Sequence, residues 1–168
     1  MSLKVNQYAE VYKRVQNTSF EQIFKLLENH TDKTLFYRGI SDKELNYLSQ
    51  VELKLGYKLP KDYLNLLKIS NGNTIFDFNF LSVTNPEDER GLFHLNFKSP
   101  FKNNYQVPQG ELVIAKSDNL FVTLGLDDES YAYYNIYEKS SKKRFLTTNE
   151  VTHIIYYEIS FHLFNKEV

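Results

Sequence analysis

Histidines and carboxylates are the side chains that could carry acid–base or metal chemistry here, because the chain contains no cysteine. The four histidines are scattered along the chain, at His30, His94, His153 and His162. No two of them have the spacing of ligands on neighbouring helical turns, and the pattern His-Glu-x-x-His is absent. The sequence also lacks a Gly-x-Ser-x-Gly nucleophile turn and a Gly-rich phosphate loop. We therefore predict no catalytic residue, no metal site and no cofactor.

Acidic residues are a second possible source of chemistry, and five of them stand in or beside polar turns: Asp77, Asp118, Asp127, Asp128 and Glu129. Two carboxylates held in an apolar pocket can act as acid and base. The spacing of these residues does not bring any two of them into such a pocket, so solvated turns are the simpler interpretation. A carboxylate-dependent hydrolase is retained as a second alternative function.

Charge is unevenly distributed, although the net charge of the chain is only −1. Residues 111–130 contain five acidic residues and one lysine, a local charge of −4, whereas residues 139–144 contain three lysines and one arginine. An acidic surface favours docking of a basic protein, such as a nuclease with a positive groove. Single-stranded RNA would need a positive groove beside stacking tyrosines, which the acidic segments disfavour. The net charge also gives no bulk attraction to nucleic acid or to an anionic membrane.

Tyrosines follow the last acidic turn and complete the predicted binding surface. Side chains alternate along a strand, so Tyr131 and Tyr133 share one face while Tyr134 points the other way, toward the core. The 13 tyrosines and 13 phenylalanines also fit an aromatic-rich core, and both interpretations stay open. The predicted partner-binding residues are Asp77, Asp118, Asp127, Asp128, Glu129, Tyr131 and Tyr133.

Periodicity gives the elements that must position these side chains. Apolar residues at helical spacing predict helices at about 3–16, 20–29, 41–55, 60–70 and 151–164. Extended segments are predicted at 34–38, 76–80, 92–97, 111–115, 120–126, 131–137 and 145–146, with an irregular loop at 99–110. The predicted fold is α+β: a largely antiparallel, curved sheet of about five to six strands, packed with N-terminal helices and one C-terminal helix.

The stretch 53–73 contains the sharpest local signals. Gly56 follows an apolar helical pattern and suits the left-handed residue that ends a helix. Pro60 suits a first helical position, because its φ is fixed and its missing N–H costs little there. Asn71 and Gly72 follow the second helix, and we predict a positive φ at Gly72. A capping box of Ser41 and Glu44 begins the preceding helix.

These residues resemble the motif of the SUKH superfamily, which includes fungal cell-wall glucan-synthesis regulators and bacterial immunity proteins. The resemblance covers residues 40–73, and its structural motif residues are Glu52, Gly56, Leu59, Pro60, Tyr63, Asn71 and Gly72. A weaker resemblance covers 111–128, where Lys116-Ser117-Asp118-Asn119 replaces the glycine-rich turn usual in the family. The resemblance implies that Glu52 binds nearby backbone; a solvated helix charge is the alternative.

The resemblance implies a non-enzymatic domain that binds and neutralises a toxin, often a nuclease. A regulatory scaffold similar to the glucan-synthesis regulators is the first alternative. The length predicts a single domain, 1–168, with an N-terminal helical extension at 1–33 and a SUKH-like core at 34–168. The lack of cysteine, of a signal-peptide core and of a membrane-length apolar run predicts a cytoplasmic protein. The oligomeric state stays open between a monomer and a weak homodimer.

Overall fold

The computed structural model describes residues 2–164, and the backbone alone for residues 2–8. The elements are α1 (Ser2–Val15), α2 (Glu21–Leu27), the 3₁₀ helix η1 (Glu28–Lys33), β1 (Thr34–Phe36), α3 (Asp42–Leu55), α4 (Lys61–Ile69), β2 (Asn73–Ile75), β3 (Phe78–Phe80), α5 (Leu92–Phe97), α6 (Phe101–Asn104), β4 (Leu112–Lys116), β5 (Leu120–Leu126), β6 (Ala132–Glu138), β7 (Arg144–Thr148) and α7 (Val151–Phe164). Met1 and residues 165–168 lie outside the described residues.

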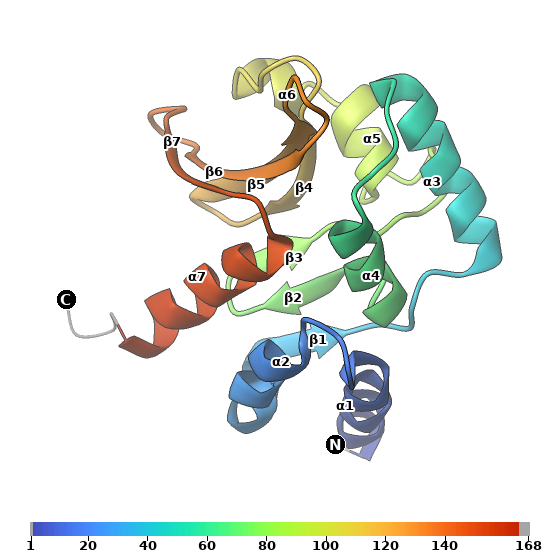
Figure 1. Ribbon diagram of the computed structural model, residues 1–168, viewed down its shortest axis with the longest axis vertical. Helices are drawn as coiled ribbons and strands as arrows, with labels where there is room; N and C mark the ends of the chain where they lie inside the picture. The colour runs from blue at the N-terminus through green and yellow to red at the C-terminus, as the bar shows by residue number, and fades with distance from the viewer. Residues whose placement is uncertain (1, 165–168) are drawn as a thin grey trace.

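The described strands form one antiparallel sheet in which they follow one another in chain order, from β1 to β7. This confirms the predicted α+β class with a C-terminal helix, although the sheet has seven strands instead of five to six. β1–β3 are short, and β4–β7 curl away from them as a longer second half (Figure 1). The register shifts in β4, between Val113 and Ala115, and between β6 and β7, at Ile136 and Tyr137.

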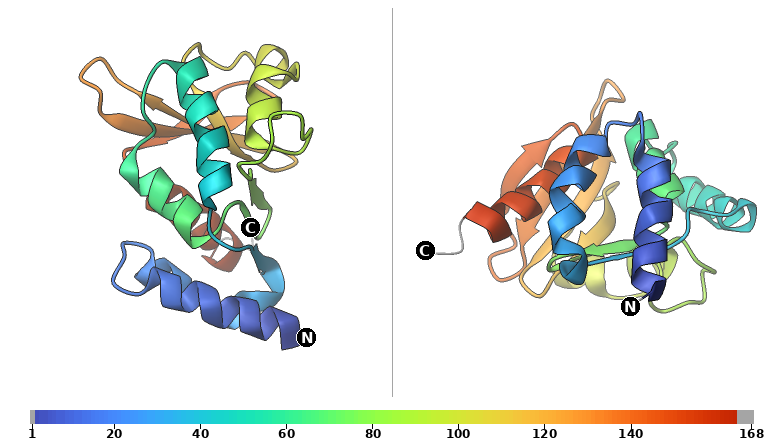
Figure 2. Two further views of the ribbon diagram at one scale, coloured as in Figure 1. Left: turned by 90° about the vertical axis from the view of Figure 1, so that its right-hand side faces the viewer. Right: turned by 90° about the horizontal axis from the view of Figure 1, so that it is seen from below.

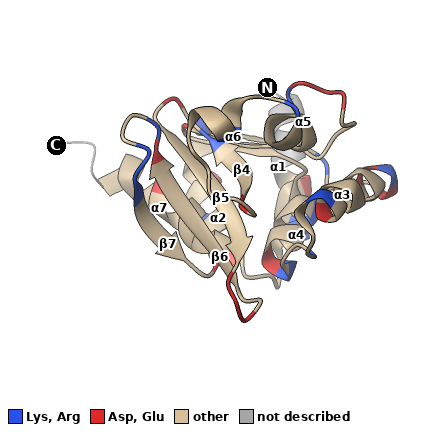
Figure 3. Cartoon of the chain, turned by 90° about the horizontal axis from the view of Figure 1, so that it is seen from above, with Lys and Arg blue, Asp and Glu red and all other residues tan. Residues whose placement is uncertain are grey.

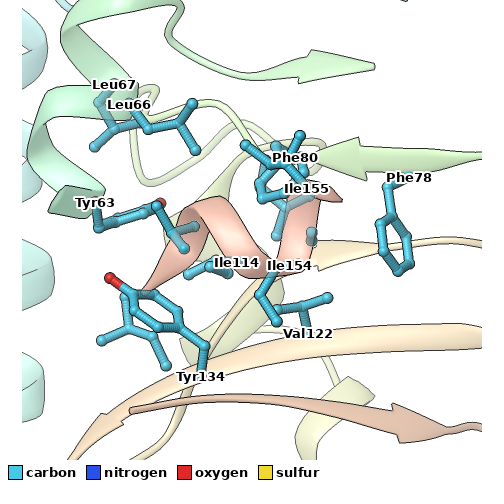
Figure 4. Close-up of a cluster of buried hydrophobic side chains, with 14 of the residues drawn as sticks. Tyr63, Leu66, Leu67, Phe78, Phe80, Ile114, Val122, Tyr134, Ile154 and Ile155 are labelled. Carbon is cyan, nitrogen blue, oxygen red and sulfur yellow. The ribbon is translucent and has the colours of Figure 1, made fainter. Parts of the chain in front are cut away.

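Helices cover the two faces of this sheet differently. α4 and α7 pack on one face, where Tyr63 of α4, Tyr134 of β6 and Ile154 of α7 are buried together (Figure 4). α6 lies on the other face, where the ring of Phe101 is 5.6 Å from that of Phe121 in β5. α1 and α2 lie below β1 and contact α4 and α7 respectively (Figure 2). No helix among the described residues is long and apolar enough to cross a bilayer.

Two short helices were not predicted from the sequence. Residues 92–97, predicted as a strand, form the helix α5, and residues 101–104 of the predicted loop form α6. α5 buries Leu92, Phe93 and Leu95, so a six-residue apolar run fits a buried helix as well as a strand. Asn96 of α5 is also buried. Its side-chain amide donates to the Val113 carbonyl at 2.9 Å and accepts the Val113 N–H at 2.7 Å, at the point where the register of β4 shifts.

The predicted strand 76–80 is only partly extended, because residues 78–80 form β3 and the two residues before them form the turn of the β2–β3 hairpin. Ile75 of β2 pairs with Phe78 of β3, so Phe76 and Asp77 form a two-residue turn. Phe76 has a φ of 53°, which is uncommon for an aromatic residue, and its ring stacks on His162 with centroids 4.7 Å apart. The sequence prediction missed this turn because Phe-Asp is not a typical turn pair, unlike Asn-Gly. Phe76 also fits the alternation of phenylalanines, which predicts a strand.

Candidate functional site

The segment between α3 and α4 is held by a hydrogen bond from the end of α3. Oε2 of Glu52 accepts the N–H of Leu59 at 2.8 Å, and Gly56 ends α3 with a φ of 85°. Leu59 is buried. Pro60 was predicted at the first position of the helix, but it is the N-cap residue, and α4 begins at Lys61. Glu52 is therefore a structural residue that binds backbone, as the resemblance implied.

The end of α4 is tied to the strand that follows β3. The side-chain amide of Asn71 donates to the Val83 carbonyl at 2.9 Å and accepts the Val83 N–H at 2.7 Å. Gly72 has a φ of 84°, as predicted, and lies against Ser82. Tyr63 is fully buried, and burial raises the pKa of its hydroxyl. All seven motif residues are thus part of the scaffold.

The β5–β6 turn places four of the predicted binding residues together on the surface. Asp127, Asp128 and Glu129 are exposed, and Tyr131 beside them has 67% of its surface exposed. Oδ1 of Asp127 accepts the N–H groups of Glu129 and Tyr131, each at 2.9 Å. This acidic turn is therefore a preorganised surface feature in which Asp127 has a structural role.

Asp118 and Asp77 lie at the opposite end of the sheet. Asp118 is in the β4–β5 turn, which is separated from the acidic turn by the length of β5, about 20–25 Å. The basic β6–β7 turn is at the same end as Asp118, where Lys139 binds the carbonyls of Ser117 and Asn119 through Nζ and N–H. Figure 3 shows acidic and basic turns at opposite ends of these hairpins. The structure thus separates the predicted carboxylates into two groups, one at each end of the sheet.

Tyr133 belongs to a buried polar network on the α6 face. Its hydroxyl donates to Oε2 of Glu111 at 3.2 Å, while Oε1 accepts hydroxyls of Thr123 at 2.6 Å and Tyr137 at 2.9 Å. Burial, and then the charge of Glu111, raise the pKa of Tyr133 to about 12. Tyr133 is only half-exposed and its ring lies against Gly125, so its contacts are largely internal. Tyr134 is fully buried, as predicted.

Asp77 meets two residues of α7 that sequence reasoning did not select. Nε2 of His162 is 3.2 Å from Oδ2 of Asp77 and 2.7 Å from Oε1 of Glu158, which also accepts the Asp77 N–H at 3.1 Å. Glu158 has only 3% of its surface exposed, and burial raises its pKa despite the opposing hydrogen bonds from Asp77 and His162. Each of the three residues offers one possible metal ligand atom, within 4.8 Å of the others.

The sequence held a signal for this cluster. Glu158 and His162 are four residues apart on a predicted helix, and therefore on one face. A search limited to pairs of histidines missed them. Asp77 is far from them in sequence, and the fold brings it beside α7. The sequence did not predict this contact, because it did not predict the β2–β3 turn.

The comparisons with known proteins identify the family. The model of the SMI1 / KNR4 family (SUKH-1) matches residues 39–155, well over half of the chain. Neither the curated proteins nor the solved structures include a match. The matched region spans α3 through the first turn of α7, and includes the structural motif and the acidic turn. The chain therefore belongs to the SMI1 / KNR4 (SUKH-1) family.

Proposed function

We propose that this chain is a non-enzymatic, cytoplasmic protein-binding domain, an immunity protein that neutralises a toxin by binding its basic domain. The acidic turn is the observation that carries the proposal. It gathers three carboxylates and the exposed Tyr131 at one end of the sheet. Membership of the SMI1 / KNR4 family also favours a role in binding another protein. Exposed charges speed the encounter with a basic partner, and an aromatic side chain slows its release.

The geometry of the turn supports a role in binding. Its backbone is fixed by the two hydrogen bonds to Asp127 and by a hydrogen bond from the Asp127 N–H to the Tyr131 carbonyl. A surface that is already ordered loses less conformational entropy when it binds. The hydrogen bonds of the turn use the backbone of Glu129 and not its side chain, and the carboxylates of Asp128 and Glu129 are exposed, so their charges are available to a partner.

Co-expression with a toxin encoded next to this chain tests the proposal. We expect the two products to co-purify as a stable complex and the chain to relieve growth arrest by the toxin. A catalytically inactive toxin that still binds is the matched control, because it separates binding from toxicity. Normal growth arrest with no complex would contradict the immunity role.

A further inference from the structure

A pocket of about 370 Å³ lies between α7 and the turns at the end of the sheet opposite the acidic turn. Its walls include three aromatic side chains, Phe145 of β7 with Tyr157 and Phe161 of α7. Its carboxylates are Asp77, Glu138 and Glu158. The pocket thus joins the β2–β3 turn, the sheet and the C-terminal half of α7.

The aromatic side chains form a continuous wall. The ring centroids of Phe145 and Tyr157 are 5.7 Å apart, and those of Tyr157 and Phe161 are 6.3 Å apart. Phe145 and Phe161 have 45% and 50% of their surfaces exposed, so their rings are open to a ligand. The faces of aromatic rings carry partial negative charge and attract cations.

The negative charge of this pocket is not balanced by a lysine or arginine among its described lining residues. Neither Lys116 nor Lys139 lines the pocket: each Nζ lies 5.9 Å from the ring centroid of Phe101 in α6, on the other face of the sheet. The Nζ of Lys139 donates to the carbonyl of Ser117, a residue of the pocket lining. His162 is the single basic side chain in the lining, and it bridges Asp77 and Glu158.

Three other pockets of the described chain are lined by lysine or arginine. The pocket of about 780 Å³ beside η1 is lined by Lys33, and that of about 470 Å³ beside α3 by Lys58, which pairs with Glu52. The pocket of about 590 Å³ beside β3 contains Arg90 and Lys116. The pocket beside α7, called the α7 pocket below, differs from these three because it has aromatic walls and three carboxylates but no lysine or arginine in its lining.

We propose that the α7 pocket binds an arginine side chain of a basic protein partner. A planar guanidinium group stacks on rings such as Phe161 and donates two parallel hydrogen bonds to one carboxylate, which an ammonium group does not match. The proposal rests on the proposed function and adds to it a specific anchor for the partner. An interface of ordinary size, about 800 Å² on each partner, is about 30 Å across, so one partner can reach both this pocket and the acidic turn.

Titration of the labelled full chain with N-acetyl-arginine-N-methylamide, followed by NMR in the presence of EDTA, tests the pocket directly. We expect millimolar binding, with amide shifts concentrated at Asp77 and residues 157–162. The neutral citrulline analogue has almost the same shape, and we expect it to bind at least about fivefold more weakly. Equal binding of the two compounds, or shifts centred on the acidic turn, would overturn the proposal.

Two exposed-site variants sharpen the assignment. Phe161→Ala removes a wall and Glu138→Gln removes a charge, and each should weaken arginine binding at least about threefold. Tyr156→Ala is the matched control: Tyr156 is on the same helix with 51% of its surface exposed, but it does not line the pocket. An equal loss in the control variant would contradict the assignment.

A separate titration with Zn²⁺ alone, without EDTA, addresses the other cation that this chemistry could hold. Micromolar Zn²⁺ binding through Asp77, Glu158 and His162, together with no arginine binding, would overturn the proposal and assign a metal site instead. Weak or absent Zn²⁺ binding, with arginine bound as expected, would support it.

The toxin complex distinguishes failure of the pocket from failure of the proposed function. A complex that forms but is indifferent to Phe161→Ala and Glu138→Gln would overturn the arginine pocket and leave the immunity role standing. Arginine binding in the pocket with no toxin complex would support the pocket and contradict the immunity role.

Discussion

Gly72 shows how a single residue fixes the turn between α4 and β2. Its φ of 84° disfavours any side chain, and a Cβ there would collide with Oγ of Ser82 and lie 3.1 Å from the Ser82 Cα. Gly56 has almost the same φ, 85°, but no atom within 4 Å of an added Cβ. The two glycines therefore separate backbone strain from crowding.

We expect Gly56→Ala to lower the free energy of unfolding by about 1–2 kcal/mol, from backbone strain alone. Gly72→Ala should cost more, because Ser82 must also move. Urea unfolding of the two variants measures the difference. Equal losses would show that Ser82 yields without cost and would refute the crowding argument.

Glu52 supports a second residue-scale prediction. Glu52→Ala leaves the Leu59 N–H without its partner and should lower the free energy of unfolding by about 1–3 kcal/mol. Glu52→Gln keeps an acceptor oxygen and should recover much of this loss.

Lys58→Ala is the control for the Glu52 variants, because Lys58 is 89% exposed and 3.7 Å from Oε1 of Glu52. We expect this change to shift the free energy of unfolding by less than about 0.5 kcal/mol, measured by urea unfolding. If Lys58→Ala costs as much as Glu52→Ala, the ion pair and not the backbone hydrogen bond stabilises this segment.

At the scale of the elements, long periodic segments were predictable and short ones were not. α3, α4 and α7 carry apolar residues over several turns, and the capping box of Ser41 and Glu44 is present as predicted. α5 has six residues, too few to distinguish helical from extended periodicity. The ring of Phe76 in the β2–β3 turn stacks on His162, and no local rule predicts a contact across 86 residues.

The same limit applies to the candidate site. The acidic turn and Tyr131 are adjacent in sequence, so their proximity could be predicted. Asp118 was grouped with them by its charge, but the strand between them places it at the other end of the sheet. Glu111 counted as part of the acidic surface, yet three hydroxyl groups surround it in the buried network. Sequence gives charge along the chain, and only the fold gives its location.

The start of α3 leads to a prediction about pH. Burial opposes ionisation of Glu44, but the Ser41 N–H, Arg38 and the Ser41 hydroxyl together lower its pKa below the usual 4.5. A lowered pKa stabilises the folded state above the unfolded-state pKa, and this contribution disappears as pH falls through the folded-state value. Glu44→Gln should therefore lower the urea midpoint at pH 7, by an amount that shrinks below about pH 4.5. A difference that stays constant across this pH range would contradict the argument.

At the scale of the whole molecule, the exposed Tyr131 is the expected aromatic anchor beside the acidic turn. Tyr133 was predicted to share this role, but its hydroxyl and ring are engaged by Glu111 and Gly125. Tyr131→Ala should therefore raise the dissociation rate of the toxin complex about tenfold or more, with little change in the association rate.

Surface plasmon resonance measures both rate constants for the Tyr131 variant. Tyr156→Ala, at a similarly exposed tyrosine on α7, is the control and should leave dissociation from the acidic turn unchanged. A Tyr131 variant with an unchanged dissociation rate would place the anchor elsewhere on the molecule.

The dependence of the toxin association rate on salt tests the central claim most directly. Reversal of Asp128 and Glu129 to Lys changes the acidic turn while sparing the backbone bonds of Asp127. Glu10→Lys with Glu89→Lys makes the same change in net charge at exposed positions away from the turn. We predict that the first variant associates at least about tenfold more slowly at low salt and approaches the wild type at high salt, whereas the second changes far less. Equal slowing by both variants, or none by either, would contradict recognition through the acidic turn.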